Sequence, residues 1–288
     1  MNLLEVCRLV DEALNEDIGS GDITTDAVID PNAAAKGKIV SRAKGMVAGI
    51  PVAGLCFRRL DARVTFEQAV EDGVKVSRND VIARVSGPAA SVLKAERVAL
   101  NFLQHLSGIA TLTASFVEAV KEYSTRILDT RKTTPGLRIL EKYAVRAGGG
   151  FNHRFGLYDG ILIKDNHLRF QTPAEGAPAA LVAAVTAAQR RAGHLQKVEV
   201  EAETLEQVKE AVEAGADAIL LDNMDVETLA KAVAIARASK KAILLEASGN
   251  VSLRNVRKVA AAGVDAISIG ALTHSAPILD IALELRPA

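Results

Sequence analysis

The chain has 288 residues, 49% of them hydrophobic, and its 35 lysines and arginines balance its 35 aspartates and glutamates to a formal net charge of zero. A neutral chain has no global positive field, which excludes nucleic acid and anionic membranes as partners. Cys7 and Cys56 are its only cysteines, which excludes a disulfide framework or a cysteine-rich zinc site and predicts a reducing, cytoplasmic location.

The first 110 residues predict a separate domain. Residues 1–19 alternate apolar and acidic side chains, which is typical of an amphipathic helix and not of a signal peptide. The segments 35–50, 62–76 and 80–88 predict short strands broken by Gly, Asp and Pro. We therefore expect a sandwich-like α+β domain over residues 1–110.

Residues 91–123 predict a helix, a break at Ser107 and Gly108, and a further helix that links this domain to the rest of the chain. The last residues, 275–288, have helical periodicity. We expect this C-terminal helix to pack back on the N-terminal domain, which leaves residues 111–274 for the second domain.

Short β-branched runs alternate with helical stretches from about residue 126 onward. The runs are RILDT, DGILIKDN, KVEVE, DAILLDN, AILLEAS and DAISIG. Alternation of this kind indicates βαβ units and a parallel sheet. Two of the intervening helices are expected to begin after Thr204 and Ser252 as N-caps and to close on Gly215 and Gly263.

Function-like residues follow these runs at the predicted carboxyl ends of the strands. They are Asp129, Lys164, Glu201, Asp222, Glu246 and Gly270. Parallel α/β barrels build their active sites at that end of the strands. An open doubly wound sheet also places its ligand there, and the number of such strand ends favours a TIM-like barrel.

Basic side chains gather around a glycine run between residues 129 and 167. The four cations beside turns or strand ends are Arg131, Lys132, Arg154 and Lys164. Four cations held together repel one another unless an anion neutralises them, so this cluster predicts a small ligand with several negative groups. The run Gly148–Gly150 offers further backbone amides for anions, a signal that counts only with Asn152–Arg154 beside it.

Paired carboxylates suggest a second kind of site. Glu199 and Glu201 point to the same side of one strand. Burying such a pair is costly unless cations or a metal accompany it, so a functional site or a buried ion pair is favoured over surface charge. Asp222 ends an apolar run, so the same choice between a functional site, a buried ion pair and surface charge applies to it. Carboxylate oxygens suit Mg²⁺ or ribose hydroxyls.

Turns after the last two strands are candidates for a phosphate site. Ser248–Asn250 and Gly270–Ala271 follow strands, where barrels commonly hold phosphate on backbone amides, although each alone fits an ordinary turn. His274 is a weak further phosphate contact. His105, at the expected helix break, is assigned a structural hydrogen bond and no functional role.

Lys164 allows a second chemistry. A lysine at a barrel strand end can form a Schiff base with a carbonyl substrate, as in class I aldolases. The surrounding arginines favour anion binding over the apolar pocket that such a lysine needs.

The motifs together resemble one enzyme family. They are EDIGSGDITTD, ERVALNFLQHLSGIAT, DTRKTTPGLR, GGGFNHRFGLYDGILIKDNH, KVEVE, AILLDN, EASGN and ISIGALTHSAP. In this order they resemble quinolinate phosphoribosyltransferase, also called nicotinate-nucleotide pyrophosphorylase (carboxylating), over nearly the full chain. The resemblance implies an N-terminal sandwich-like domain and an incomplete α/β barrel of fewer than eight strands.

The implied reaction joins quinolinate to 5-phosphoribosyl 1-pyrophosphate and yields nicotinate mononucleotide, pyrophosphate and CO₂ in de novo NAD biosynthesis, with Mg²⁺ required. By resemblance, Lys132, Lys164, Glu201 and Asp222 are catalytic. Quinolinate binds Arg131, His153, Arg154 and Lys164, with Arg97 supplied by the partner subunit of a homodimer. Lys132 lies near pyrophosphate, Glu201 and Asp222 hold ribose hydroxyls or the metal, and Ser248, Gly249 and Gly270, with their neighbours Asn250 and Ala271, take the 5′-phosphate.

Asn250 departs from the family pattern, where many relatives carry glycine. A backbone amide contact survives this change, although the residue's conformation is less free. A related protein of molybdenum-transport operons and a non-catalytic regulator on the same barrel are the alternatives. A regulator would not need both the cation cluster and the acidic strand ends.

Overall fold

The computed structural model describes residues 2–170 and 179–288. The chain forms two compact units. Unit 1 comprises Met1–Ala114, Lys132–Gly150 and Ala271–Ala288, and unit 2 comprises Ser115–Arg131 and Phe151–Gly270. Unit 1 is therefore built from three separate stretches of the chain.

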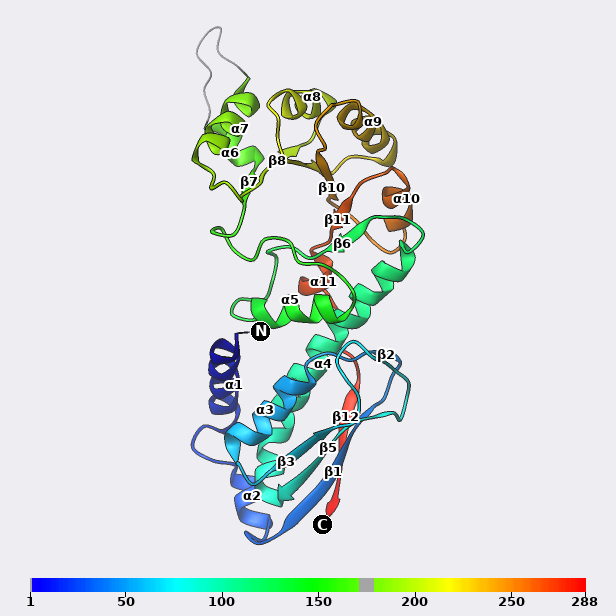
Figure 1. The fold of residues 1–288 in the computed structure, drawn as a ribbon. Helices are drawn as coiled ribbons and strands as arrows, with labels where there is room; N and C mark the ends of the chain where they lie inside the picture. Colours follow the sequence, from blue (N-terminus) through cyan, green and yellow to red (C-terminus); the bar gives the residue numbers. More distant parts are fainter. Residues whose placement is uncertain (1, 171–178) are drawn as a thin grey trace. The chain divides into compact units, whose positions relative to one another are not determined.

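Unit 1 contains a four-stranded antiparallel sheet in the order β12-β1-β5-β3 (Figure 1). Its strands are β1 (Ala34–Ser41), β3 (Thr65–Gln68), β5 (Val81–Pro88) and β12 (Ile281–Pro287), and β2 (Gly45–Met46) pairs with β4 (Lys75–Val76). The helices that begin in this unit are α1 (Leu3–Ile18), α2 (Ile23–Val28), α3 (Ile50–Leu60), α4 (Ala89–Ala119), α5 (Arg138–Ala147) and α11 (Ala271–His274). The early strands and the helix α1 agree with the sequence prediction.

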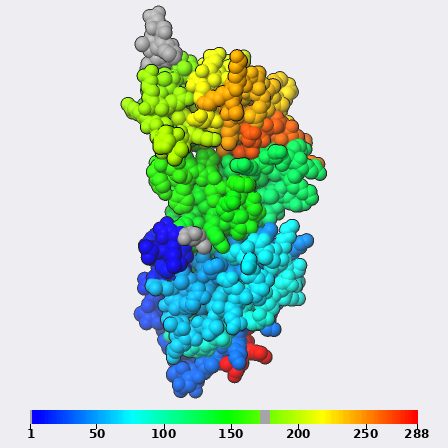
Figure 2. Space-filling view, viewed as in Figure 1, coloured from blue at the N-terminus to red at the C-terminus, as the bar shows by residue number. Residues whose placement is uncertain are grey.

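The helix predicted over residues 275–288 is wrong. This segment forms strand β12, which pairs with β1 from Ala35 opposite Pro287 to Ser41 opposite Ile281. Figure 2 shows the red C-terminal residues beside blue residues of the N-terminal part. The segment is short, and its apolar side chains repeat every second residue, so its spacing fits a strand once a neighbouring strand supplies hydrogen bonds.

The break predicted at Ser107 and Gly108 is also wrong, because α4 runs unbroken through both. Ser107 Oγ accepts from the backbone N–H of Ala48 at 3.0 Å. A Cβ on Gly108 would lie 2.1 Å from the carbonyl oxygen of Pro277. The two small residues therefore allow close packing within unit 1. Neither α4 nor any other described helix is long and apolar enough to cross a membrane.

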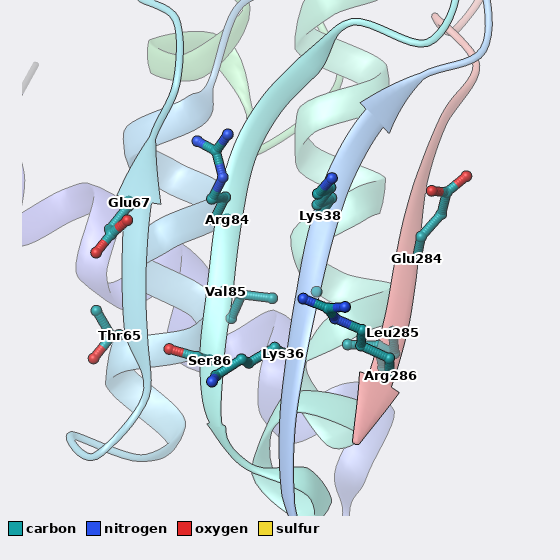
Figure 3. Close-up of a pocket in the computed structure, with 11 residues that line it drawn as sticks. Lys36, Lys38, Thr65, Glu67, Arg84, Val85, Ser86, Glu284, Leu285 and Arg286 are labelled. Atoms are coloured by element: carbon teal, nitrogen blue, oxygen red, sulfur yellow. The ribbon is translucent and has the colours of Figure 1, made fainter. Parts of the chain in front are cut away.

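One face of the four-stranded sheet carries charged side chains around a groove of about 410 Å³. Figure 3 shows these side chains in front of the sheet and helices behind it. Strand register places Lys38 opposite both Arg84 on β5 and Glu284 on β12, and Glu284 also pairs with Arg42 at 2.8 Å. All four of these charged side chains are at least partly exposed to solvent.

Unit 2 contains a six-stranded parallel sheet in the order β6-β11-β10-β9-β8-β7 (Figure 1). Its strands are β6 (Arg126–Leu128), β7 (Ile161–Ile163), β8 (Val198–Ala202), β9 (Ala218–Asp222), β10 (Leu244–Ser248) and β11 (Ala266–Ser268). The connecting helices are α6 (Asp165–Arg169), α7 (Ala180–Arg191), α8 (Leu205–Glu213), α9 (Val226–Arg237) and α10 (Val256–Ala261). All six strands predicted from the β-branched runs are confirmed.

The two predicted helix caps have different outcomes. Thr204 caps α8 as expected, with its hydroxyl accepting from Gln207 N at 3.2 Å. Ser252 is not the cap of α10, which begins after Asn255. The backbone N–H of Ser252 instead donates to Asn255 Oδ1 at 2.7 Å, so a turn precedes the helix.

The parallel sheet is an incomplete ring. Within this sheet, β6 comes first along the chain and pairs with β11, which comes last. Strands β6 and β7 stand at opposite ends of the strand order. No strand ladder joins β6 to β7 within residues 2–170 and 179–288; the free edge of β6 has a single bridge, from Leu128 to Phe151. The α/β class and the incomplete barrel are thereby confirmed.

Candidate active site

The register of the parallel strands brings predicted residues together at their carboxyl ends. Ser248 on β10 lies level with Asp222 on β9. Lys164 follows β7, whose last residue is level with Val200 on β8, so Lys164 and Glu201 become neighbours. Lys164 Nζ lies 3.0 Å from Glu201 Oε2, with the lysine side chain 46% exposed and the glutamate side chain 8% exposed.

Three carboxylates gather at this edge of unit 2. Glu201, Asp222 and Glu203 each place an oxygen within 4.8 Å of the other two. Such a set of hard oxygen donors fits Mg²⁺. Glu203 was not predicted, although it continues the alternate spacing of Glu199 and Glu201 just past the strand.

Asp129 anchors the loop that follows Phe151. Its carboxylate is fully buried and accepts from Asn152 Nδ2 and, at 2.8 Å, from the backbone N–H of His153. A buried carboxylate is tolerated when donors surround it. Asp129 therefore holds the backbone of Asn152 and His153, the residues just before Arg154.

His153 bonds within unit 2 through both ring nitrogens. Its Nδ1 accepts from the backbone N–H of Arg154 at 2.7 Å. Its Nε2 lies 3.4 Å from Glu199 Oε2 and 3.6 Å from Glu246 Oε1. Because Nδ1 accepts, a neutral ring carries its proton on Nε2 and points it at the two carboxylates. A protonated nitrogen cannot ligate a metal, so this cluster fits Mg²⁺ less well than the three carboxylates at the strand ends.

Glu246 is an unusual carboxyl. Its pKa is raised to about 7: burial is the largest cause, the charge of Glu199 adds to it, and His153 and Ser268 oppose the shift. The side chain is 3% exposed, and its Oε1 has no hydrogen-bond partner in the described part of the chain. Glu246 therefore carries a proton in a large fraction of molecules near neutral pH.

Arg131 and Arg154, which both belong to unit 2, interact electrostatically. Burial lowers the pKa of Arg154, the nearby charge of Arg131 lowers it further, and Glu199 and Asp159 oppose the shift. Arg154 donates through Nη1 to the carbonyl of Gly160 at 2.8 Å, while its Nε has no hydrogen-bond partner among the described residues. Two guanidinium groups this close favour a ligand with carboxylates.

A cavity of about 750 Å³ lies inside unit 2. Arg154, His153, Glu199 and Glu246 contribute to its walls. The cavity is therefore bordered by both charge signs: a guanidinium and an imidazole on one hand, and the carboxyls of Glu199 and Glu246 on the other.

The turn after β10 holds Asn250 in a backbone conformation that few residues other than glycine adopt. Asn250 has a φ of 52°, in the left-handed region that asparagine tolerates better than most residues. Its amide donates to Asn223 Oδ1 at 3.3 Å, and Asn223 N donates to Ser248 O at 3.0 Å. Gly249 has a φ of 91°, and a Cβ there would lie 2.1 Å from Asn223 Oδ1. Asn223, which was not predicted, thus shapes this turn.

Three predicted site residues and the weaker candidate His274 belong to unit 1. Arg97 is exposed on α4, and Lys132 is exposed in a segment without helix or strand. Ala271 is the first residue of α11 and directly follows Gly270, the last residue of unit 2. His274 is exposed and contacts Ser275 Oγ.

The glycine run does not offer its amides to an anion. The N–H groups of Gly148, Gly149 and Gly150 donate to the carbonyls of Ala144, Arg146 and Val145 and so end α5. A Cβ on Gly148 would lie 2.5 Å from the carbonyl oxygen of Ala110. Helix termination and close packing explain the run, and the prediction of an anion-binding amide cluster is wrong.

Sequence models of known families match almost the whole chain. Residues 22–107 match the quinolinate phosphoribosyl transferase N-terminal domain, and residues 109–284 match its C-terminal domain. The chain belongs to the quinolinate phosphoribosyltransferase family.

Relatives of this family span bacteria and plants. A probable nicotinate-nucleotide pyrophosphorylase [carboxylating] from Bacillus subtilis is 43% identical, covering 99% of this chain and 95% of the relative. A quinolinate phosphoribosyltransferase [decarboxylating] from Nicotiana glauca is 40% identical, covering 99% and 82%. The solved structure of NadC from Streptococcus pyogenes is 39% identical with a TM-score of 0.92, covering 100% and 99%. The similarity therefore extends through both units.

Proposed function

We propose that this chain is a phosphoribosyltransferase that joins quinolinate to 5-phosphoribosyl 1-pyrophosphate, with decarboxylation, to give nicotinate mononucleotide, pyrophosphate and CO₂ in de novo NAD biosynthesis. The observation that carries the proposal is the presence in unit 2 of the Arg131 and Arg154 pair together with the carboxylates Glu201 and Asp222. Cations suit a dicarboxylate, and carboxylates suit ribose hydroxyls and a metal. The names of the relatives support the same reaction.

The proposal assigns roles to the predicted residues. Arg131, His153, Arg154 and Lys164 bind quinolinate; Lys132 acts at pyrophosphate; Glu201 and Asp222 act at ribose; Ser248, Gly249, Asn250, Gly270 and Ala271 bind the 5′-phosphate. His153 bonds to protein groups through both nitrogens, so we expect it to act mainly by orienting the Arg154 backbone.

Mg²⁺ is the proposed cofactor. Glu201 and Asp222, with Glu203 beside them, would hold it directly, through water or through the substrate. The ion would supply positive charge to the pyrophosphate group.

In the proposed mechanism, departing pyrophosphate leaves an oxocarbenium-like ribose that the pyridine nitrogen attacks. Electrostatic stabilisation dominates and no covalent enzyme intermediate forms. The quaternised ring nitrogen then stabilises the carbanion left when the adjacent carboxylate departs as CO₂, and a proton from water takes the place of that carboxylate. Neither pyridoxal nor thiamine is therefore required. Lys164 lies beside a carboxylate and is half exposed, which differs from the apolar surroundings of a Schiff-base lysine.

Pyrophosphate release tests the reaction. We expect release when the chain, Mg²⁺ and both substrates are mixed, and none when either substrate is omitted. A non-catalytic regulator would release nothing, and a relative with another substrate would not respond to quinolinate. Irreversible labelling of Lys164 by borohydride plus a carbonyl substrate would instead favour the aldolase-like alternative.

We also propose a homodimer in which Arg97 enters the site of the neighbouring subunit. Arg97 is exposed on α4, as this role requires. Arg97→Ala and Lys164→Ala proteins should each be nearly inactive. In a mixed dimer one site carries both changes and the other carries neither, so subunit exchange should restore activity toward about one quarter of wild type. No recovery after demonstrated exchange would remove Arg97 from the partner's site.

A cytoplasmic location is part of the proposal. It is supported by the two free cysteines, of which Cys56 is buried, because disulfides are rare in reducing compartments.

A further inference from the structure

The segment Lys132–Thr134 belongs to neither a helix nor a strand, yet each of its residues is bound by a different side chain of unit 1. The carbonyl of Lys132 accepts from Thr273 Oγ1 at 2.8 Å. Thr133 Oγ1 accepts from Arg138 Nε at 2.9 Å. The backbone N–H of Thr134 donates to Glu141 Oε2 at 3.1 Å. A segment of this kind is mobile by default, so three separate tethers indicate that its conformation matters.

Glu141 is the buried, charged side chain among these tethers. It lies in the first turn of α5 with no exposed surface, and a buried carboxylate needs hydrogen-bond donors to offset its lost hydration. One of its oxygens serves Thr134, and the other lies 2.9 Å from Nε2 of His105 on α4. The carboxylate therefore links the core of unit 1 to an otherwise irregular segment.

His105 orients this carboxylate. Its side chain is 29% exposed, whereas that of Glu141 is fully covered. When Nε2 donates to Oε1, the other oxygen is turned toward Thr134, because the two oxygens share one rigid plane. His105 thus fixes the carboxylate, and the carboxylate fixes the backbone next to Thr133 and Lys132.

We propose that Glu141 and His105 are positioning residues that hold the Lys132 segment in the conformation that acts on the pyrophosphate group of the substrate. The inference rests on the proposed function, in which Lys132 meets pyrophosphate. Neither residue needs to touch the substrate. A small displacement of a group that contacts the reacting atoms is enough to lower the rate strongly.

A purely structural role for Glu141 has a matched control on the same helix. Tyr143 of α5 donates to Asp72 Oδ2 at 2.6 Å, and Asp72 also accepts from the backbone N–H groups of Gly49 and Ile50. Within unit 1, this network ties α5 to the start of α3 without contacting Lys132–Thr134. Tyr143→Phe therefore removes a hydrogen bond of α5 and leaves the segment's own tethers intact.

The experiment compares the full-length wild type with Glu141→Ala, Glu141→Gln, His105→Ala, Tyr143→Phe and Lys132→Ala. Initial rates are measured with 5-phosphoribosyl 1-pyrophosphate and quinolinate varied in turn, and thermal unfolding is recorded for each protein. We expect Glu141→Ala to lower kcat/KM for 5-phosphoribosyl 1-pyrophosphate about tenfold and to change KM for quinolinate less than about twofold. Lys132→Ala should show the same selectivity with a larger loss.

The conservative variant Glu141→Gln sharpens the test. Its new amide side chain keeps an oxygen for the backbone N–H of Thr134, and the amide nitrogen can donate to His105 once the ring moves its proton to Nδ1. Glu141→Gln should therefore stay within about threefold of wild type. The His105→Ala and Glu141→Ala double variant should be no worse than Glu141→Ala alone, because His105 acts through Glu141.

Two outcomes would overturn the inference. In the first, Glu141→Ala resembles Tyr143→Phe, with lower stability and unchanged kinetics, while Lys132→Ala is impaired. In the second, Lys132→Ala is as active as the wild type. A wild-type protein that releases no pyrophosphate would contradict the proposed function itself, so the two failures are distinguishable.

Discussion

The four-stranded sheet of unit 1 and the six-stranded sheet of unit 2 carry charged side chains in opposite ways. On the antiparallel sheet of unit 1, Lys38 and Arg84 stand on a face open to solvent (Figure 3). In the parallel sheet of unit 2, Glu246 lies buried within its strand, and Glu201 is nearly as buried next to Lys164. Water screens the charges on the antiparallel sheet, so these side chains cost little free energy and contribute little to stability.

Burial makes the charged side chains of the parallel sheet costly in free energy. A buried carboxyl must find a cation, a hydrogen-bond donor or a proton. Glu201 has Lys164, whereas burial raises the pKa of Glu246 and so favours its protonated form. The exposed charges of unit 1 serve hydration, whereas the buried charges of unit 2 are costly and so indicate a functional role. The predictions that follow run from the largest expected effect to the smallest.

The largest effect is expected at Lys164. Its replacement by alanine removes a cation from the strand ends and leaves Glu201 without its partner, so kcat/KM should fall roughly 10²- to 10³-fold, as for loss of one preorganised charge-stabilising group. Steady-state kinetics would measure this. The exposed Lys209→Ala is the control and should match the wild type; equal losses in both variants would remove the special role of Lys164.

Glu246→Gln should change the pH dependence of stability. The pKa of Glu246 is raised from 4.5 to about 7 in the folded state, so the folded protein binds the proton more tightly. The stabilisation that this proton gives the folded state is complete below pH 4.5 and is lost as the pH rises through 7. The glutamine variant does not lose this stabilisation. Between pH 4.5 and 8, its free energy of unfolding should therefore rise relative to that of the wild type by up to about 3 kcal/mol.

Denaturant unfolding at several pH values would measure the difference for Glu246→Gln. The exposed Glu213→Gln serves as the control. Parallel pH profiles of wild type and Glu246→Gln would show that Glu246 does not retain its proton, and would weaken the distinction between the two sheets.

Arg154→Ala should weaken quinolinate binding by about 1.5–3 kcal/mol, the loss of a charge-assisted hydrogen bond, and leave 5-phosphoribosyl 1-pyrophosphate binding largely intact. Asp222→Ala should do the reverse. Calorimetric titration of each variant with each ligand decides. Similar losses for both ligands in both variants would contradict the division of roles.

The smallest effect is expected on the open sheet. Lys38→Ala removes a charge that faces both a like and an opposite charge, so stability should change by less than about 0.5 kcal/mol and activity should not change. Thermal unfolding and the pyrophosphate assay measure both. A clear loss of activity would show that this face has a function and would break the comparison.

The same contrast explains what the sequence could predict. The six strands of unit 2 were predictable because buried parallel strands are continuous β-branched runs. Glu201 and Asp222 were predictable because parallel strands end at one edge. The positions of these two residues depend on the direction of the local chain, which a sequence pattern reveals.

The failures involve contacts between distant segments. Strand β12 depends on hydrogen bonds to β1, which its own spacing does not reveal. Gly108 and Gly148 are small because other backbone segments approach them. Glu141 and Asn223 were missed because their partners, Thr134 and Asn250, become neighbours only through loop geometry. Such tertiary requirements override local propensity.

The pairing of β12 with β1 also has a consequence for biosynthesis. Strand β1 is translated long before its partner β12. During elongation β1 therefore presents an unpaired edge, a site for wrong association with other nascent chains. Unit 2 is complete in sequence before β12 appears, so it can fold first, whereas unit 1 is complete only once β12 has emerged. Deleting residues 281–287 should thus yield a protein whose second unit is soundly folded but whose first unit aggregates.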